Sequence, residues 1–343
     1  MNNNSASKKK IRVLVVDDSL VSREFIIRGL NSDPEITVVA KASDPFEARN
    51  RILEFHPDVM TCDIQMPKMN GIDFIRKLLP QYPLPVVVVS SISEAIFDAL
   101  NAGAVEFVAK PGINDSFDDF ISNLISKIKI ASKSKLTLNK RLLQSKQSVK
   151  SDLTKKFDLI AIGASTGGTE AIHFILKSLP REIPGIVIAQ HIPPVFSKMF
   201  AERLKAQTVF DVKEAENGDI VEPGCVYIAP GHQHIIVKKV GKNNMIRFYS
   251  GESSSVHTPS VDVLFDSVAE AVGNKALGVI LTGMGRDGAK GLLHMRNKGA
   301  RTVGQDEESS VVYGMPKAAY EIGAVEKQVS LDRIPSTILN LLA

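Results

Sequence analysis

The stretch GASTGG, from Gly163 to Gly168, follows an apolar run and places a serine hydroxyl between glycines. A glycine-flanked serine between a strand and a helix has the form of a nucleophile elbow, in which a sharp turn exposes the hydroxyl. The same pattern fits a loop that holds a phosphate. A dinucleotide fingerprint is a further alternative, but Ser165 stands where its second glycine would be. Ser165 therefore needs partners elsewhere in the chain before a reaction can be assigned to it.

A serine becomes a useful nucleophile when a histidine takes its proton and a carboxylate holds the histidine. His191 follows the apolar run GIVIAQ and precedes Ile-Pro-Pro, while Asp287 lies in GVILTGMGRDGAKG, after a second apolar run and a glycine-rich turn. Taken singly, His191 fits a structural role and Asp287 fits the N-cap of the following helix. Together with Ser165 they predict a Ser-His-Asp triad, with amides of the Gly283–Gly285 turn available to an oxyanion.

A metal site is the rival interpretation for the histidines. His232 and His234 lie two residues apart and would join His191 as ligands. No acidic or thiolate ligand accompanies them at a recognised spacing. A catalytic zinc ion is therefore disfavoured.

A second group of reactive side chains lies in the first 110 residues. Asp17 and Asp18 follow one apolar run and Asp63 follows another, while Ser90 and Lys110 end two more. Three carboxylates at one edge of a parallel sheet repel each other, so a divalent cation with oxygen ligands is expected there. With the cation bound, Asp63 can accept a phosphoryl group whose oxygens Lys110 and Ser90 contact. For any single aspartate the alternative is a helix cap, and Asp18 fits that role.

The elements that must position these residues follow a βα pattern. Near-continuous apolar runs predict parallel strands covered on both faces, and five successive βα units predict a flavodoxin-like domain. In this first domain, the expected strands are Ile11–Val16, Val38–Ala42, Val59–Cys62, Pro85–Val89 and Glu106–Ala109. The expected helices include Val21–Leu30 and Pro45–Phe55.

A second α/β pattern begins at Phe157 and predicts a doubly wound, mainly parallel domain. Its expected strands are Leu159–Ile162, Ile186–Gln190, Val226–Ala229, Ile235–Val240 and Leu277–Leu281. Its expected helices are Glu170–Lys177, Phe196–Lys205, Val261–Val272 and Ala289–Asn297. The expected organisation is a basic tail (1–10), a first domain (11–130), a basic linker (131–156) and a second domain (157–343).

The expected linker mixes lysines and an arginine with Ser and Gln, which predicts a solvated connector with some helix around Lys140–Ser145. A docking strip for an acidic partner is the alternative. The net charge of +4 is concentrated in this linker and in the tail, and no aromatic residue interrupts the linker's basic side chains before Phe157. Nucleic-acid binding is therefore not expected.

Composition excludes several other classes of protein. Hydrophobic residues make up 44% of the 343 residues and charged residues 23%, as in ordinary globular proteins. Cys62 and Cys225 are the two cysteines, which excludes a disulfide framework and fits a reducing compartment. Without a signal-peptide pattern or an apolar stretch long enough to cross a bilayer, a cytoplasmic protein with no membrane insertion is expected.

The first domain, over Ile11 to Ile130, resembles the receiver domain of two-component signalling in the stretches VLVVDDS, DVMTCDIQMPKMNGIDF, PVVVVSS and EFVAKP. The resemblance implies that Asp63 is phosphorylated with the help of Mg²⁺, and that a chemotaxis histidine kinase donates the phosphoryl group. The implied magnesium ligands are Asp18, Asp63 and the backbone of Gln65, with Asp17 acting through water. The implied switch and phosphate-binding residues are Ser90, Phe107 and Lys110.

The second domain resembles the catalytic domain of the chemotaxis protein-glutamate methylesterases in IAIGASTGG, AQHIPP, VYIAPG, PSVDVLF, GVILTGMGRDGAKG and SSVVYGMPKAA. The resemblance implies Ser165 as nucleophile, His191 as base and Asp287 as orienting acid, with Thr166 and the Met284 amide assisting. The chain order Ser, His, Asp differs from that of the α/β-hydrolases, so their fold is not implied. The sequence departs from the family pattern at Thr258, because many relatives carry a basic residue before Pro259. This difference bears on the substrate groove and not on the chemistry.

The resemblance implies hydrolysis of glutamate methyl esters on methyl-accepting chemoreceptors, with release of methanol, and deamidation of receptor glutamines. No cofactor is expected for the esterase reaction, and a monomer is expected. The receiver is expected to cover the Ser165 edge until Asp63 is phosphorylated. Two alternatives are a transcription factor, disfavoured because no recognition-helix pattern follows the linker, and a serine esterase for small molecules.

Overall fold

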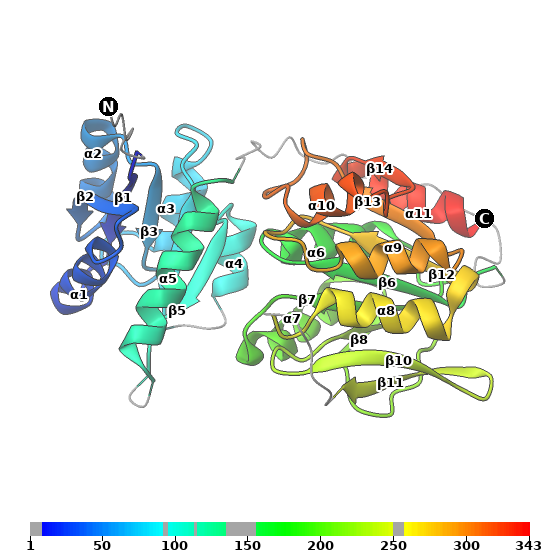
Figure 1. Cartoon of the computed structure of the whole chain (residues 1–343). Helices are drawn as coiled ribbons and strands as arrows, with labels where there is room; N and C mark the ends of the chain where they lie inside the picture. The colour runs from blue at the N-terminus through cyan, green and yellow to red at the C-terminus, as the bar shows by residue number, and fades with distance from the viewer. Residues whose placement is uncertain (1–8, 92–94, 113–114, 135–155, 250–256) are drawn as a thin grey trace, which may run out of the picture. The chain divides into compact units, whose positions relative to one another are not determined.

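The computed structural model of the chain describes residues 9–91, 95–112, 115–134, 156–249 and 257–343 (Figure 1). The chain divides into two compact units, residues 1–138 and 139–343. The expected basic tail (1–10) and linker (131–156) lie largely outside the described residues, as does the expected helix around Lys140–Ser145.

The first unit contains a five-stranded parallel sheet with the order β2-β1-β3-β4-β5 (Figure 1). Its strands are β1 (Ile11–Val16), β2 (Ile36–Ala42), β3 (Val59–Cys62), β4 (Val86–Ser90) and β5 (Glu106–Ala109). The flavodoxin-like architecture expected from the sequence is confirmed. The expected bounds of β1, β3 and β5 agree with the structure, while β2 begins two residues earlier and β4 lies one residue later.

Among the described residues of the first unit, four helices connect the strands and a fifth follows β5. They are α1 (Leu20–Asn31), α2 (Pro45–Phe55), α3 (Gly71–Leu78), α4 (Ile96–Asn101) and α5 (Phe117–Ala131). The N-cap of α1 is Ser19, whose hydroxyl accepts the Ser22 N–H, so the interpretation of Asp18 as a helix cap is wrong. Asp44 caps α2 with two backbone hydrogen bonds, and Pro45 occupies the first helical position, where no N–H is needed.

The second unit contains a seven-stranded parallel sheet with the order β14-β13-β12-β6-β7-β9-β8. Its strands are β6 (Leu159–Ala164), β7 (Gly185–Gln190), β8 (Asp211–Glu214), β9 (Cys225–Ile228), β12 (Ala276–Ile280), β13 (Arg301–Gln305) and β14 (Lys327–Val329). From β6 the chain adds strands first on the β7 side and later on the β12 side. The crevice beyond the ends of β6, β7 and β12 is therefore the topological switch point, where ligands bind in such folds.

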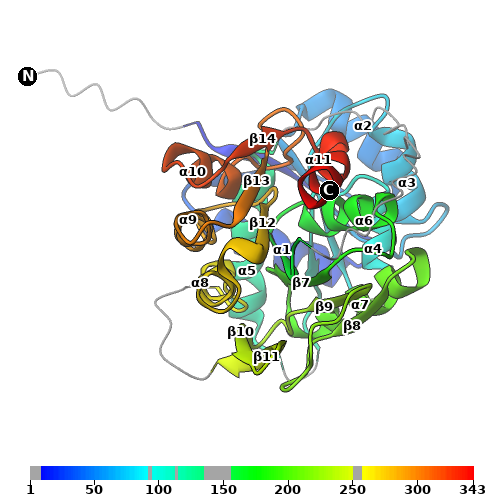
Figure 2. The same ribbon diagram turned by 90° about the vertical axis from the view of Figure 1, so that its right-hand side faces the viewer.

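Helices cover both faces of this sheet, with α8, α9 and α10 on one side and α6, α7 and α11 on the other (Figure 2). They are α6 (Gly168–Ser178), α7 (Pro194–Gln207), α8 (Val261–Ala271), α9 (Ala289–Asn297), α10 (Met315–Glu321) and α11 (Ile334–Leu342). The expected doubly wound, mainly parallel fold is confirmed. Of the strands in this seven-stranded sheet, β8, β13 and β14 were not expected from the sequence.

An antiparallel hairpin of β10 (His234–Val240) and β11 (Asn243–Tyr249) stands apart from the large sheet. Helix α8 contacts both β10 and β6, and its Ser267 hydroxyl accepts the Val237 N–H at 2.9 Å. The expected strand Ile235–Val240 is therefore present, but it pairs only with β11, which the sequence did not predict. The hairpin therefore packs against α8, which also packs on β6 of the large sheet.

Helix α8 packs on β6 in the core of the second unit. The buried residues of α8 recur at helical spacing, so one stripe of the helix faces the sheet. A Cβ atom at Gly163 would lie 2.1 Å from Val261 Cγ1 and 3.1 Å from Phe265 Cζ. Glycine at this position therefore lets α8 approach the end of β6 directly before Ser165.

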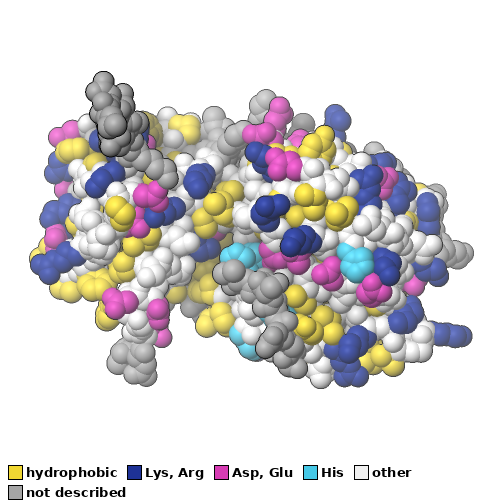
Figure 3. All heavy atoms as spheres, in the orientation of Figure 1, with side chains coloured by type: hydrophobic (Ala, Val, Ile, Leu, Met, Phe, Trp, Pro, Cys, Tyr) yellow, Lys and Arg dark blue, Asp and Glu magenta, His cyan; other side chains and the backbone are white. Residues whose placement is uncertain are grey.

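Charges of both signs are interspersed on the face of the molecule seen in Figure 3. On the second unit, Lys298 pairs with Glu270, and His294 lies 2.9 Å from Glu270 and 3.0 Å from Asp266. His294 thus bridges α8 and α9. Within the described residues, no helix combines the length and apolar character needed to cross a membrane.

Replacing Phe265, which is fully buried in α8, by alanine should leave a cavity between α8 and the sheet. We expect Phe265→Ala to lower the free energy of unfolding by about 3–5 kcal/mol. Phe248→Ala on the exposed part of β11 should lower it by less than about 1 kcal/mol, because that ring is 38% exposed. Urea unfolding followed by circular dichroism measures both. Equal losses in the two variants would contradict this account of the core.

Candidate active site and phosphoacceptor site

Three carboxylates meet at the ends of β1 and β3 in the first unit. Asp17 and Asp18 follow β1 and Asp63 follows β3, and one oxygen from each lies within 4.8 Å of the others. Asp17 and Asp63 are buried, whereas Asp18 is exposed. The N–H of Gln65 donates to Asp63 Oδ1 at 3.2 Å. Such a set of oxygen donors fits a hard divalent cation.

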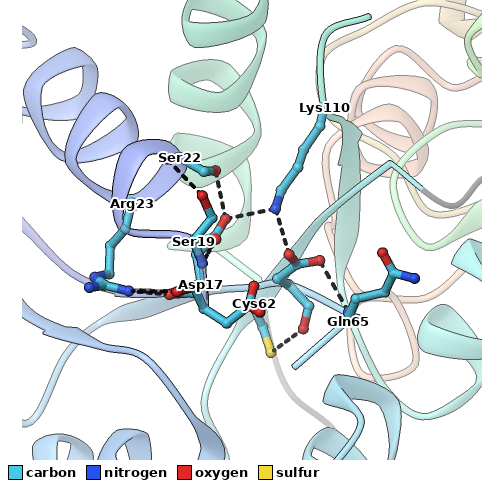
Figure 4. Close-up of polar contacts among 9 residues, drawn as sticks. Asp17, Ser19, Ser22, Arg23, Cys62, Gln65 and Lys110 are labelled. Atoms are coloured by element: carbon cyan, nitrogen blue, oxygen red, sulfur yellow. Dashed lines mark hydrogen bonds and ion pairs between the residues drawn. The ribbon is translucent and has the colours of Figure 1, made fainter. Parts of the chain in front are cut away.

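Lys110, directly after β5, supplies the positive charge of this cluster (Figure 4). Its Nζ lies 2.8 Å from Asp17 Oδ2 and 2.5 Å from Asp63 Oδ2. Burial raises the pKa of Asp63, although Lys110 opposes that shift. Burial would lower the pKa of Lys110, but its bonds to Asp17 and Asp63 outweigh burial and raise it. Lys110 thus pairs with two carboxylates of a cluster of three, which leaves negative charge for a cation to balance.

Asp17 is held by the start of α1 as well as by Lys110 (Figure 4). Its Oδ1 accepts the Ser19 N–H at 2.9 Å and its Oδ2 accepts the Ser22 hydroxyl at 2.7 Å. The Arg23 guanidinium donates to the Asp17 carbonyl at 2.5 Å. Sequence reasoning missed Ser22 and Arg23. They could have been found from their position in the first turn of a helix that begins beside a predicted metal ligand.

The other predicted residues of this unit lie on the neighbouring strands. Ser90 ends β4 and is buried, and its carbonyl accepts the Lys110 N–H at 2.9 Å. Phe107 lies in β5, paired with Val88 of β4, and is also buried. The register of β4 and β5 therefore brings Ser90 beside Lys110, at the same sheet edge as Asp63.

In the second unit, Ser165 and His191 follow two adjacent parallel strands. Ala164 of β6 pairs with Gln190 of β7, so the next residue on each strand leaves the sheet at the same level. The His191 N–H donates to the Ala164 carbonyl at 3.1 Å. After Ser165 the chain turns through Gly167, whose φ of +75° suits glycine, and α6 begins. The strand-turn-helix context expected of a nucleophile elbow is present.

His191 and Asp287 are in direct contact, with Nε2 2.8 Å from Oδ2. Because a carboxylate can only accept, Nε2 carries the hydrogen and Nδ1 is left with a lone pair for proton transfer. Across the described chain, no hydrogen bond joins Ser165 Oγ to the imidazole. Catalytic hydrogen bonds often tighten only when substrate is bound. The His257 ring stacks on the His191 ring with centroids 4.4 Å apart.

Asp287 accepts three further hydrogen bonds from the start of α8. The donors are the Ser260 hydroxyl at 3.0 Å, the Val261 N–H at 2.8 Å and the Asp262 N–H at 2.9 Å. The interpretation of Asp287 as N-cap of the following helix is wrong, since Gly288 is the N-cap of α9. The carboxylate instead lies at the N-terminus of α8, where free N–H groups favour an anion.

These contacts set the charge of Asp287. Burial would raise its pKa, but the hydrogen bonds from His191, Asp262 and Val261 outweigh burial and lower the pKa to about 2. Asp287 is therefore ionised at neutral pH and can stabilise an imidazolium. Sequence reasoning missed Ser260. It could have been found as a serine that caps the helix beginning with the apolar run VDVLF. The Ser260 N–H in turn donates to His234 Nδ1 at 3.0 Å, which places His234 beside Ser260.

The turn after β12 lies against Ser165. The Ser165 N–H donates to the Thr282 carbonyl at 3.0 Å, and a Cβ atom at Gly283 would lie 2.7 Å from Ser165 Cβ. Met284 comes next, and its N–H has no hydrogen-bond partner in the part of the chain that the structure describes. The Thr166 carbonyl accepts the Thr282 hydroxyl at 3.0 Å. Both residues predicted to assist the reaction thus belong to segments fixed beside Ser165.

The low pKa of Asp287 makes a prediction about stability and pH. Because its pKa in the folded protein lies below the ordinary value of 3.8, the carboxylate stabilises the fold above about pH 4. This contribution is lost as the pH falls from about 4 towards 2. A shift of this size corresponds to about 2 kcal/mol, so Asp287→Asn should lower the free energy of unfolding by about that amount near pH 7.

The difference between the wild-type protein and Asp287→Asn should be smaller at about pH 3, as measured by urea unfolding at both pH values. Asp332→Asn, at an exposed position, is the control and should change stability by less than about 0.5 kcal/mol. A difference for Asp287→Asn that does not depend on pH contradicts the assignment.

Comparisons with known proteins agree with this geometry. Residues 160–338 match the CheB methylesterase family, and residues 13–121 match the response regulator receiver domain. Protein-glutamate methylesterase/protein-glutamine glutaminase 2 of Syntrophomonas wolfei is 53% identical over 336 residues, which cover 97% of this chain and 98% of that protein. Protein-glutamate methylesterase/protein-glutamine glutaminase 1 of Caulobacter vibrioides is 49% identical over 339 residues, with the same coverage of 97% and 98%.

The crystal structure of the Thermotoga maritima CheB methylesterase catalytic domain is 37% identical, with a TM-score of 0.53, and covers 54% of this chain and 98% of that chain. The resemblance stated from the sequence motifs is therefore confirmed. The chain belongs to the CheB methylesterase family and carries a response regulator receiver domain before its catalytic unit.

Proposed function

We propose that this protein is a phosphorylation-regulated methylesterase and glutaminase that acts on methyl-accepting chemoreceptors in chemotaxis. The observation that carries the proposal is the contact between His191 and an ionised Asp287 at the sheet edge where β6 ends in Ser165. The names of the full-length relatives support the same reaction on protein glutamate and glutamine side chains.

In this mechanism Ser165 Oγ attacks the carbonyl carbon of a glutamate methyl ester while His191 Nδ1 takes the serine proton. Asp287 keeps the imidazole in the required tautomer and stabilises its positive charge. The tetrahedral oxyanion receives a hydrogen bond from the Met284 N–H, and Thr166 assists at the start of α6. The C–O bond to the methoxy group breaks, His191 returns the proton, and methanol leaves.

The second half-reaction restores the enzyme. Water attacks the acyl group on Ser165, and His191 accepts a proton from that water. The ester bond to Ser165 then breaks, the serine regains its proton, and a free glutamate remains on the receptor. With a receptor glutamine, the same steps release ammonia instead of methanol. No step requires a cofactor.

We assign the regulatory site to the carboxylate cluster of the first unit. Asp63 is the proposed acceptor of a phosphoryl group from a chemotaxis histidine kinase. Bound Mg²⁺ would offset the charge of the incoming phosphoryl oxygens, and the proposed ligands are Asp18, Asp63 and the backbone of Gln65, with Asp17 acting through water. The proposed phosphate-binding and switch residues are Lys110, Ser90 and Phe107.

The proposed enzyme works in the cytoplasm as a monomer, without nucleic acid and without insertion into the membrane. All three residues of the proposed triad come from one chain, so one copy suffices for the chemistry. The proposed organisation keeps the tail at 1–10, the receiver at 11–130, the linker at 131–156 and the catalytic domain at 157–343.

Ser165→Ala tests the esterase assignment. Without the nucleophile, release of methanol from receptor membranes carrying tritiated methyl esters should fall by at least about 10³-fold, because the acyl-enzyme cannot form. Ser178→Ala, in the last turn of α6, is the control and should retain activity. Activity of the wild-type protein on a chromogenic small ester but not on receptor membranes would instead favour a small-molecule esterase.

Phosphorylation tests the regulatory assignment. A small phosphodonor with Mg²⁺ should raise the rate of methanol release about 5- to 150-fold, the usual range for coupling between two sites. Asp63→Asn should abolish the increase but keep the basal rate, while Asp118→Asn, on the surface of α5, should respond as the wild type does.

Removing the residues before Phe157 should raise the basal rate. An unchanged rate after that removal contradicts the idea that the receiver covers the catalytic site.

A further inference from the structure

The side chain of Gln190 is a buried polar group at the centre of the catalytic unit. Gln190 is the last residue of β7, directly before His191, and only 2% of it is exposed. Its side chain does not reach into solvent, where a substrate would bind. Its role must therefore be sought in what it contacts inside the fold.

Gln190 Nε2 donates two hydrogen bonds, to the Ser165 carbonyl at 2.9 Å and to the His191 carbonyl at 3.0 Å. Both acceptors are carbonyl oxygens, so only the NH₂ group of the amide can occupy this position. One side chain thus joins the backbone of the proposed nucleophile to the backbone of the proposed base. These bonds lie just beyond the last paired residues of β6 and β7, where the bond from the His191 N–H to the Ala164 carbonyl also joins the two segments.

The amide oxygen of Gln190, in contrast, makes no hydrogen bond in the described structure. Oε1 is buried and has no hydrogen-bond partner among the described residues. It lies against Gly168, where a Cβ atom would come within 2.2 Å of it. A buried acceptor without a partner is destabilising. The stabilising contacts of this amide are therefore the two bonds from Nε2, which end on Ser165 and His191.

We propose that Gln190 is a positioning residue that sets the separation of Ser165 and His191 through their backbones. The proposal rests on the esterase mechanism above. Because Ser165 Oγ and the imidazole make no hydrogen bond to each other in the described structure, their side chains do not hold one another in place. Asp287 orients the imidazole, but the spacing of the two residues depends on their backbones, and a misplacement of about 1 Å can cost about 10²-fold in rate.

Gln190→Met tests the proposal, since methionine has a similar length and volume but no donor. In the full-length protein we expect kcat for methanol release from methyl-esterified receptor membranes to fall about 10- to 100-fold, with KM changed by less than about twofold. A fluorophosphonate, whose phosphorus bonds to Ser165 Oγ with loss of fluoride and the serine proton, should label the variant more slowly by a similar factor. Gln190→Glu, which places oxygen against two carbonyl oxygens, should lose more activity than Gln190→Met.

Thr302→Val is the matched control for lost stability. Thr302 is fully buried in β13, and its hydroxyl also makes two hydrogen bonds to the backbone, at 2.7 Å to the Ala324 carbonyl and 3.0 Å from the Glu326 N–H. Thr302→Val should lower Tm but leave kcat and the labelling rate within about twofold of the wild type. If Gln190→Met does not fold, Gln190→Asn, whose amide is one methylene too short to reach both carbonyls, is measured in the same way.

The outcomes separate this inference from the function on which it rests. Wild-type kcat and labelling rate in the folded Gln190 variant overturn the positioning role, while the esterase assignment stands. An equal loss of activity in Thr302→Val at an equal loss of Tm also overturns it, because general destabilisation then explains both. Failure of the fluorophosphonate to label Ser165 in the wild-type protein defeats the esterase assignment and this inference together.

Discussion

The catalytic unit depends on one buried negative charge, the carboxylate of Asp287. A buried carboxylate without partners is costly, and this one is compensated by the His191 imidazole, the Ser260 hydroxyl and two N–H groups of α8. The turn after β12, the end of β7 and the start of α8 must therefore meet at one point. The contact that sets the tautomer of His191 is also a contact that fixes the packing of three elements.

The two units place their reactive groups by the same rule, at the carboxyl ends of parallel strands, but they balance charge differently. In the catalytic unit, Asp287 accepts hydrogen bonds from His191, from the Ser260 hydroxyl and from two N–H groups of α8. In the receiver unit, Lys110 pairs with two carboxylates of a cluster of three, those of Asp17 and Asp63. The described contacts thus compensate the charge of Asp287 more fully than that of the receiver cluster.

Much of this arrangement could be predicted from sequence because apolar runs mark buried parallel strands and their ends mark sheet edges. That reasoning placed Ser165 and His191 correctly at the ends of β6 and β7. It missed β13, because Thr302 and Gln305 are polar yet buried, with partners distant in sequence. It also missed the role of Ser260, since the local pattern indicates a helix cap but not the carboxylate 27 residues away that this cap binds.

The position of β12 in the sheet has a consequence for how the protein is made. Strand β6 pairs with β7 on one side and with β12 on the other, but β12 is synthesised more than a hundred residues after β6. Until then, a nascent chain holds the serine and the histidine beside an unpaired strand edge, which is prone to associate with other chains. The ribosome must therefore translate past residue 287 before β12 can pair with β6. The pairing of β12 then covers the strand edge and brings Asp287 to His191.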